Sequence, residues 1–422
     1  MSVAVAKARE AASTRAAWAR YTVTRIATIG DQVLVSLANF GLTLAIGRAY
    51  STRELASYGI GLSMGLMIQG VQRHALIIPL MLLSRTRVAR RCGGIVAAHL
   101  IVLCCVLLFG GACFLIAGQL GAPQYSYQII AAGAACLIVY VQLEFARAIL
   151  VKLDRPLFLC AHGAWYASVS CLLAVGALTH RVGYEMLLLA LCGAMIVSAL
   201  VIAVAMRPIL PRLGLRLLDR DARRYGGWAA VATATYAGYN HVPLLVLGAL
   251  AAPVHAAAFV ATRSLLQPLQ ILLRGLDLAD KQAFSKTARM PQARSTLVFI
   301  FKLAGIYALV AGVLCAGIAS FAEPLIVSSY GGNYAGFGPT LIAWTPVFVL
   351  LSMAMPLESL VYAREEFRSY YIVRGIGSLA AIALTAILVG PFAEVGAIAA
   401  CGVGGLVAIT GTVVLLRRGT RQ

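Results

Sequence analysis

Residues 184–206 read YEMLLLALCGAMIVSALVIAVAM, and residues 207–226 directly after them read RPILPRLGLRLLDRDARRYG. The first segment carries a single charged residue, Glu185, near its start. It is long enough to cross a bilayer as a helix, which takes about 20 apolar residues. The second segment is rich in arginine, and Lys and Arg concentrate in the cytoplasmic connections of membrane proteins. This junction therefore predicts a membrane-spanning helix that ends on the cytoplasmic side.

The composition of the whole chain agrees with this junction. Of its 422 residues, 61% are hydrophobic and 12% are charged, and the mean hydropathy is +0.88. Soluble domains average roughly 45–50% apolar and about 25% charged residues. The composition therefore excludes a water-soluble enzyme, a disordered regulator and a fibrous protein. We expect an all-α polytopic membrane protein.

The apolar runs predict twelve membrane spans joined by short connections. They lie at residues 25–47, 56–83, 94–119, 126–146, 157–178, 184–206, 227–249, 253–275, 296–320, 338–362, 370–390 and 394–416. Thirty of the 35 Lys and Arg residues fall in the amino-terminal arm, the alternate connections and the tail, or near the adjoining ends of the spans, as Arg25, Arg274, Lys302 and Arg374 do. Only Arg48, Arg53 and Arg181 fall on the opposite side. This bias predicts that both termini are cytoplasmic, and it accounts for most of the net charge of +20 without a nucleic-acid partner.

The twelve spans divide into two halves of six, because six spans return the chain to its starting side. We expect two parallel six-helix bundles, related by an axis along the membrane normal, with a cavity between them. The predicted units are a cytoplasmic basic amino-terminal arm (1–24), a first six-helix bundle (25–206), a cytoplasmic linker (207–226), a second six-helix bundle (227–416) and a cytoplasmic tail (417–422). The connection 321–337 reads as an ordinary loop.

Polar side chains at membrane depth are the candidate functional residues, since a buried charge costs about 2.5–3.5 kcal/mol on insertion scales. The span at 253–275 places a polar stripe on one helical face, and the span at 56–83 carries a similar set. A stripe of donors with few acids suits an anionic, hydroxyl-rich ligand, because arginine offers a bidentate fork to phosphate. The candidates are Arg25, Asn39, Gln69, Gln72, Arg73, His74, Asn240, Arg263, Gln267, Gln270 and Arg274.

The same residues also have structural interpretations. Arg263 could pair with Asp31 or Glu144 as a contact between helices. Glu144 has Arg147 three residues later, so a local ion pair is the alternative to a functional role. Asp31 and Glu358 are the acids that could hold a coupling ion or a proton. Catalytic signatures such as GxSxG, HExxH and a Walker loop do not occur in a suitable setting, so we expect no catalytic residue, metal or cofactor.

Residues 30–85 resemble the first-span signature of bacterial oligosaccharide flippases, which belong to the multidrug/oligosaccharidyl-lipid/polysaccharide exporter superfamily. The matching residues are Asp31-Gln32, Ser36, Asn39-Phe40, Gly47-Arg48, Glu54 and Tyr58-Gly59, with Pro356-Leu357-Glu358 in the tenth span. The resemblance implies a MATE-like V-shaped pair of bundles around a cationic cavity. It also implies that the chain moves a polyprenyl-diphosphate-linked oligosaccharide to the outer leaflet by alternating access, for polysaccharide assembly.

The resemblance also implies site residues and partners. Arginines on spans one, two and eight line the cavity of the related lipid II flippases, and by position these are Arg25, Arg73 and Arg263. The implied partners are the lipid-linked oligosaccharide, membrane lipids, and the polysaccharide polymerase and export machinery, in a bacterial inner membrane. Lipid II flippases have fourteen spans and sodium-binding acids on spans seven and eleven. This chain has no acid at 227–249 or 370–390.

Three rival functions remain open. A multidrug exporter of the same superfamily would bind cations through Asp31. A transporter of the major facilitator type would have an Asp-Arg signature between spans two and three, which residues 84–93 lack. A scaffold for polysaccharide-assembly enzymes would not transport, and it would therefore tolerate the loss of both Arg73 and Arg263.

Overall fold

The computed structural model describes residues 2–77, 80, 85–207, 231, 233–270, 273, 293–364 and 367–418. These residues form helices and short connections, and no strand occurs among them. Eight of the helices are long and apolar enough to cross a membrane. The expected class, an all-α polytopic membrane protein, is confirmed. Beyond Arg207 and up to residue 226, the predicted linker lies outside the described residues.

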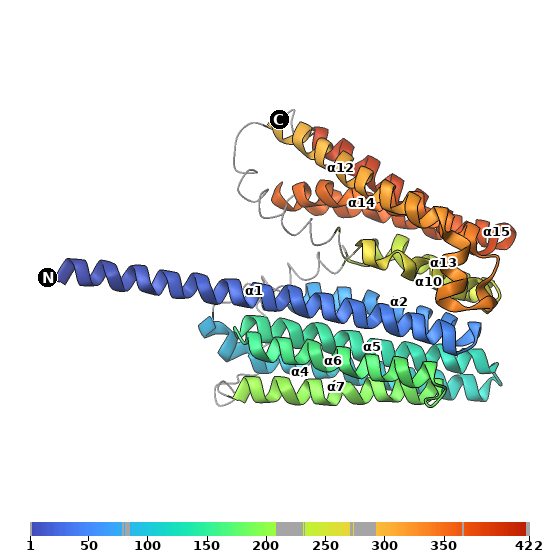
Figure 1. Ribbon diagram of the computed structural model, residues 1–422, viewed down its shortest axis with the longest axis horizontal. Coiled ribbons are helices and arrows are strands. Elements are labelled where there is room, and N and C mark those ends of the chain that lie inside the picture. Colours follow the sequence, from blue (N-terminus) through green and yellow to red (C-terminus); the bar gives the residue numbers. More distant parts are fainter. Residues whose placement is uncertain are drawn as a thin grey trace.

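The described residues of the first bundle form six helical segments. They are α1 (Ser2–Ala49), α2 (Thr52–Gln72) with its π-helical extension η1 (Arg73–Ile77), α4 (Arg85–Gln119), α5 (Gln124–Lys152), α6 (Pro156–Leu178) and α7 (Tyr184–Met206). The amino-terminal arm is the first part of α1 and projects beyond the other helices (Figure 1). The turn between α1 and α2 is fixed by a capping box, in which Ser51 N donates to Glu54 Oε2 at 2.7 Å and Glu54 N donates to Ser51 Oγ at 3.4 Å.

The second bundle is less regular. Its described helices are α9 (Val242–Leu250), α10 (Pro253–Leu265), α12 (Ala293–Ser320), α13 (Ala322–Tyr330), the 3₁₀-helix η3 (Gly332–Tyr334), α14 (Gly338–Arg364) and α15 (Phe367–Arg418). The last of these holds two of the expected spans, because Ala393 breaks the helix with a φ of 46°.

The prediction of an ordinary loop at 321–337 was wrong, because the segment contains α13 and η3. The nine residues of α13 are too few to show up as a span in hydropathy. The Glu323 carboxylate fixes the segment by accepting hydrogen bonds from the backbone N–H groups of Gly336 at 2.6 Å and Gly338 at 2.8 Å.

Close packing inside the first bundle depends on small residues of α2. A Cβ added to Gly61 would come within 2.5 Å of the Ala132 carbonyl carbon on α5, and one added to Gly65 would come within 2.9 Å of the Cys136 oxygen. The GxxxG spacing of these two glycines thus lets two backbones approach each other, as it does in membrane helix pairs generally.

The two bundles form a V (Figure 1). They contact each other near the α1–α2 turn, which we call the closed end, and their helices diverge toward the end from which α1 projects, which we call the open end. The contacts at the closed end pair Gly59 with Val260, Ile60 with Gly248, Gly47 with Tyr330, and the Arg48 guanidinium with the Ser328 carbonyl. A further contact, Gly70 with Thr233, lies roughly 17 Å farther along α2 and one turn before Arg73.

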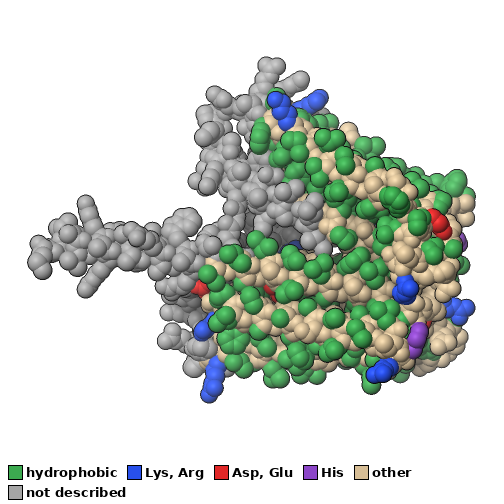
Figure 2. Space-filling view, in the orientation of Figure 1, with side chains coloured by type: hydrophobic (Ala, Val, Ile, Leu, Met, Phe, Trp, Pro, Cys, Tyr) green, Lys and Arg blue, Asp and Glu red, His purple; other side chains and the backbone are tan. Residues whose placement is uncertain are grey.

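Hydrophobic side chains are spread over both bundles on the face of the molecule that Figure 2 shows. Large exposed side chains include Leu108 and Phe109 on α4, Leu189 on α7 and Leu379 on α15. A water-soluble monomer rarely exposes so many large apolar side chains, so the faces that carry them are the lipid-contacting surface of a multi-pass membrane protein.

Candidate functional site

Four charged side chains form an alternating ion network inside the first bundle. Arg73 Nε donates to Glu144 Oε1 at 2.6 Å, and Arg147 Nε donates to Asp31 Oδ2 at 2.5 Å. Arg147 Nη1 also lies 3.4 Å from Glu144 Oε2, which joins the two pairs. The Asp31 side chain is fully buried, whereas 47% of the Arg73 side chain is exposed. Arg73 is therefore the member of the network that can meet a ligand.

The predicted span at 126–146 ends just before Arg147, whereas the helix in the structure is longer. Helix α5 continues to Lys152, so Arg147 lies within the bundle and neutralises Asp31. The structure also pairs Glu144 with Arg73 and Arg147 rather than with Arg263. The two acids that could have held Arg263 are thus both neutralised inside the first bundle.

A row of glutamine, histidine and serine side chains also crosses the interior of the first bundle. Neighbours in the row lie 2.7–3.5 Å apart, in the order Gln72, His99, Gln142, Ser198 and His162. Gln72, one of the candidate site residues, is buried in this row within the first bundle. Gln69 is half-buried and donates to Glu144 Oε2 at 3.2 Å.

Arg263 is the central candidate in the second bundle. Its Nη1 donates to the backbone oxygen of Asn240 at 2.6 Å, and its Cζ lies 5.4 Å from the ring centroid of Trp344 on α14. The side-chain nitrogens Asn240 Nδ2 and Trp344 Nε1 are buried, and neither has a hydrogen-bond acceptor within the described residues. Arg263, Asn240 and Trp344 thus lie side by side, and we call these three residues the donor cluster.

The remaining candidates are placed around these two clusters. Asn39 is half-buried, and its Oδ1 accepts a hydrogen bond from the Tyr166 hydroxyl at 2.6 Å. Gln267 and Gln270 are half-buried on a short helical segment that follows the end of α10 at Leu265, so the predicted stripe is not on one continuous helix. The side chains of Arg25, His74 and Arg274 lie outside the described residues.

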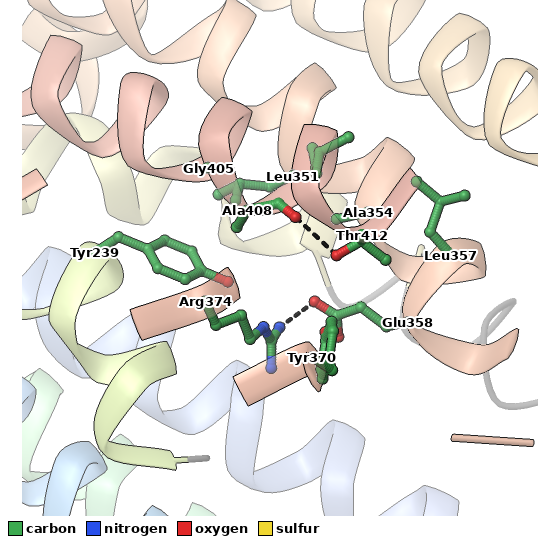
Figure 3. A pocket seen from close by; sticks show the side chains of 11 residues that line it. Tyr239, Leu351, Ala354, Leu357, Glu358, Tyr370, Arg374, Gly405, Ala408 and Thr412 are labelled. Atoms are coloured by element: carbon green, nitrogen blue, oxygen red, sulfur yellow. Dashed lines mark hydrogen bonds and ion pairs between the residues drawn. The ribbon is translucent and has the colours of Figure 1, made fainter. Parts of the chain in front are cut away.

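Glu358 lies in a separate pocket of the second bundle, where the guanidinium of Arg374 contacts its carboxylate (Figure 3). Sequence reasoning missed Arg374 as its partner, although a signal was present, since Arg374 is the single charged residue at 370–390. Trp344 beside Arg263 had no such signal, because an aromatic residue in an apolar run is unremarkable.

The two candidate arginines lie at different depths. Helices α2 and α10 both start near the closed end, where Gly59 and Val260 are in contact. At 1.5 Å of rise per residue, Arg263 lies roughly 5 Å beyond that contact and Arg73 roughly 20 Å beyond it, toward the open end. A ligand that moves along the V from the open end would therefore pass Arg73 before Arg263.

The fold has known counterparts, although no family model and no curated protein matches the sequence. One similar solved structure is described as lipid II flippase MurJ in an inward closed conformation, with 13% identity, a TM-score of 0.71, and coverage of 94% of this chain and 87% of that one. Another is an inward-facing multidrug resistance MATE family transporter of the MOP superfamily, with 14% identity, a TM-score of 0.63, and coverage of 93% and 98%.

A third similar structure is a MOP superfamily transporter from Pyrococcus furiosus, described as having a binding pocket of reversed polarity. It shares 14% identity with this chain, at a TM-score of 0.61 and with 95% of each chain covered. These likenesses confirm the expected polytopic all-α membrane fold. At such low identity they do not extend to the substrate.

Proposed function

We propose that the protein flips a polyprenyl-diphosphate-linked oligosaccharide from the cytoplasmic to the outer leaflet of a bacterial inner membrane, for polysaccharide assembly. Both termini are then cytoplasmic, and the open end of the V faces the cytoplasm. The observation that carries this proposal is the donor cluster at Arg263, where Asn240 Nδ2 and Trp344 Nε1 are buried without acceptors. Phosphate and sugar hydroxyl oxygens supply such acceptors, and a buried unpaired donor is costly until one arrives.

The depths of the two arginines suggest the order of binding. Arg73 is half-exposed near the open end, so it meets the diphosphate first and holds it with the part of its guanidinium that Glu144 leaves open. Arg263 lies deeper and takes the diphosphate or the first sugar next. Gln69, Asn39, Gln267 and Gln270 contact the glycan along this path, and Arg25 extends the basic path toward the arm.

The electrical potential favours this direction of transport. Moving one net charge across 100 mV is worth about 2.3 kcal/mol, and a diphosphate that leaves a negative-inside cell moves downhill. Export of cationic drugs would instead need an acid that is free to bind them. Asp31, the acid that would serve in that function, is bound to Arg147.

The direct test uses a strain that lacks the gene. We expect a complete lipid-linked repeat unit to accumulate in the cytoplasmic leaflet and surface polysaccharide to be lost, because synthesis of the repeat continues while flipping stops. Mass spectrometry of extracted lipids measures the pool, and it also identifies the glycan. Normal lipid-linked pools with normal surface polysaccharide would contradict the proposal and would direct attention to cation export.

A cross-link at the closed end tests alternating access. A Cβ built on Gly59 lies 3.0 Å from the Cβ of Val260, slightly closer than the roughly 3.5–4.5 Å of a disulfide. We expect the pair Gly59→Cys and Val260→Cys to stop flipping after oxidation and to recover it after reduction, since the closed end can no longer open.

The controls for the cross-link are the two single-cysteine variants and the wild type, each treated with the same oxidant. They report any effect of the native cysteines. Full flipping by protein that is demonstrably cross-linked would show that the closed end does not need to separate.

A further inference from the structure

The pocket around Arg374 lies outside the donor cluster at Arg263 and plays no part in the proposed binding path. Glu358 comes from α14, Tyr370 and Arg374 come from the first half of α15, and Thr412 comes from its second half. Tyr239, from the helical segment before α9, directs its hydroxyl toward the Arg374 guanidinium (Figure 3). The pocket thus connects four helical segments of the second bundle.

The chemistry of the pocket is that of a cation site. Arg374 Cζ lies 4.6 Å from the ring centroid of Tyr370 and 5.0 Å from that of Tyr236. Both distances fall within the roughly 6 Å over which an aromatic face attracts a cation. The Glu358 carboxylate completes the site by bonding the guanidinium, and Arg374 is only 4% exposed.

We infer that the pocket lined by Glu358, Tyr239 and Tyr370, together with the neighbouring ring of Tyr236, is a binding site for a small organic cation, and that the chain fills it with its own Arg374. A free guanidinium ion takes the same place when the Arg374 side chain is removed. While Arg374 is present, an external cation has to displace the Arg374 guanidinium. That guanidinium is covalently tethered beside the site, so its effective concentration there is high. Glu358 is then a structural partner that holds α14 against α15, rather than the exchangeable proton or ion site predicted from the sequence.

The test measures the thermal unfolding of purified protein, so it does not depend on the substrate or on a flipping assay. Arg374→Ala leaves the Glu358 carboxylate without its guanidinium, and we expect its melting temperature to lie below that of the wild type. Methylguanidinium at about 10 mM should raise the melting temperature of Arg374→Ala by about 3 °C or more and should leave the wild type unchanged. Urea, which has a similar planar shape but no charge, should have no such effect at the same concentration.

Arg417→Ala is the matched control, because Arg417 also lies over an aromatic ring, Phe301 at 6.0 Å, but does not line the pocket. Methylguanidinium should not change the melting temperature of Arg417→Ala. The inference is overturned if Arg374→Ala does not respond to methylguanidinium, or if urea or an equal concentration of NaCl stabilises it as much.

A second variant keeps the inference testable if Arg374→Ala does not accumulate. Arg374→Ala combined with Glu358→Gln removes both charges, so we expect protein levels to recover, without a response to methylguanidinium. Two results would show that the carboxylate does not define the site. One is that the double variant does not accumulate. The other is that methylguanidinium raises its melting temperature by as much as we expect for the single variant.

Discussion

Arg263→Ala should reduce flipping roughly 10- to 150-fold while the protein level stays near that of the wild type. A hydrogen bond to a charged group contributes about 1.5–3 kcal/mol, and each 1.4 kcal/mol is a factor of ten. In the structure, Arg263 Nη1 donates to the neutral backbone oxygen of Asn240. The phosphate of the proposed substrate is a stronger acceptor for the guanidinium, because it is negatively charged. The measurement is the rate at which the lipid-linked repeat unit reaches the outer leaflet in a strain that carries the variant.

The control for this prediction is Arg181→Ala, because Arg181 is exposed and lies far from the donor cluster in the chain. It should flip at the wild-type rate. Arg263→Lys should fall between the wild type and the alanine variant, since it keeps the charge but loses the bidentate fork. If Arg263→Ala instead lowers the protein level and the remaining protein flips normally, Arg263 is a contact between helices and the donor cluster is structural.

Much of the fold could be predicted because the sequence features that determine the spans are local. Each span is a run of apolar residues bounded by charged or turn-forming ones, and the basic residues fall on alternate connections. The elements that hydropathy did not predict are short or combine polar with apolar residues. Helix α13 has nine residues, and its position depends on the Glu323 carboxylate bonding to Gly336 and Gly338.

The site was less predictable, because the partner of a buried charge is chosen by tertiary packing. The local spacing of Glu144 and Arg147 was visible in the sequence, but the shorter contact of Arg147 is with Asp31, which is 116 residues away. The partner of Glu358 lies on another helix in the same way. A sequence can therefore show that a membrane-embedded acid needs a cation, but it does not show which cation the fold supplies.

Arg147→Ala should be the most destabilising replacement in the first bundle. It leaves Asp31, whose side chain is fully buried, without its guanidinium, and removing one partner of a buried ion pair costs about 3–5 kcal/mol. We expect the melting temperature of the purified protein to fall by about 5–15 °C. Arg155→Ala, at an exposed arginine just beyond the end of α5, is the matched control and should melt with the wild type.

The pair Asp31→Asn and Arg147→Gln separates stability from coupling at the same position. Because it removes both charges and keeps side chains of similar shape, it should recover most of the stability lost in Arg147→Ala. We also expect it to flip the lipid-linked oligosaccharide, since in the proposed mechanism Asp31 holds the bundle together and the substrate carries the charge. A stable double variant that cannot flip would instead make Asp31 the site of a coupling proton or ion. Arg147 would then be the group that releases Asp31 during the transport cycle.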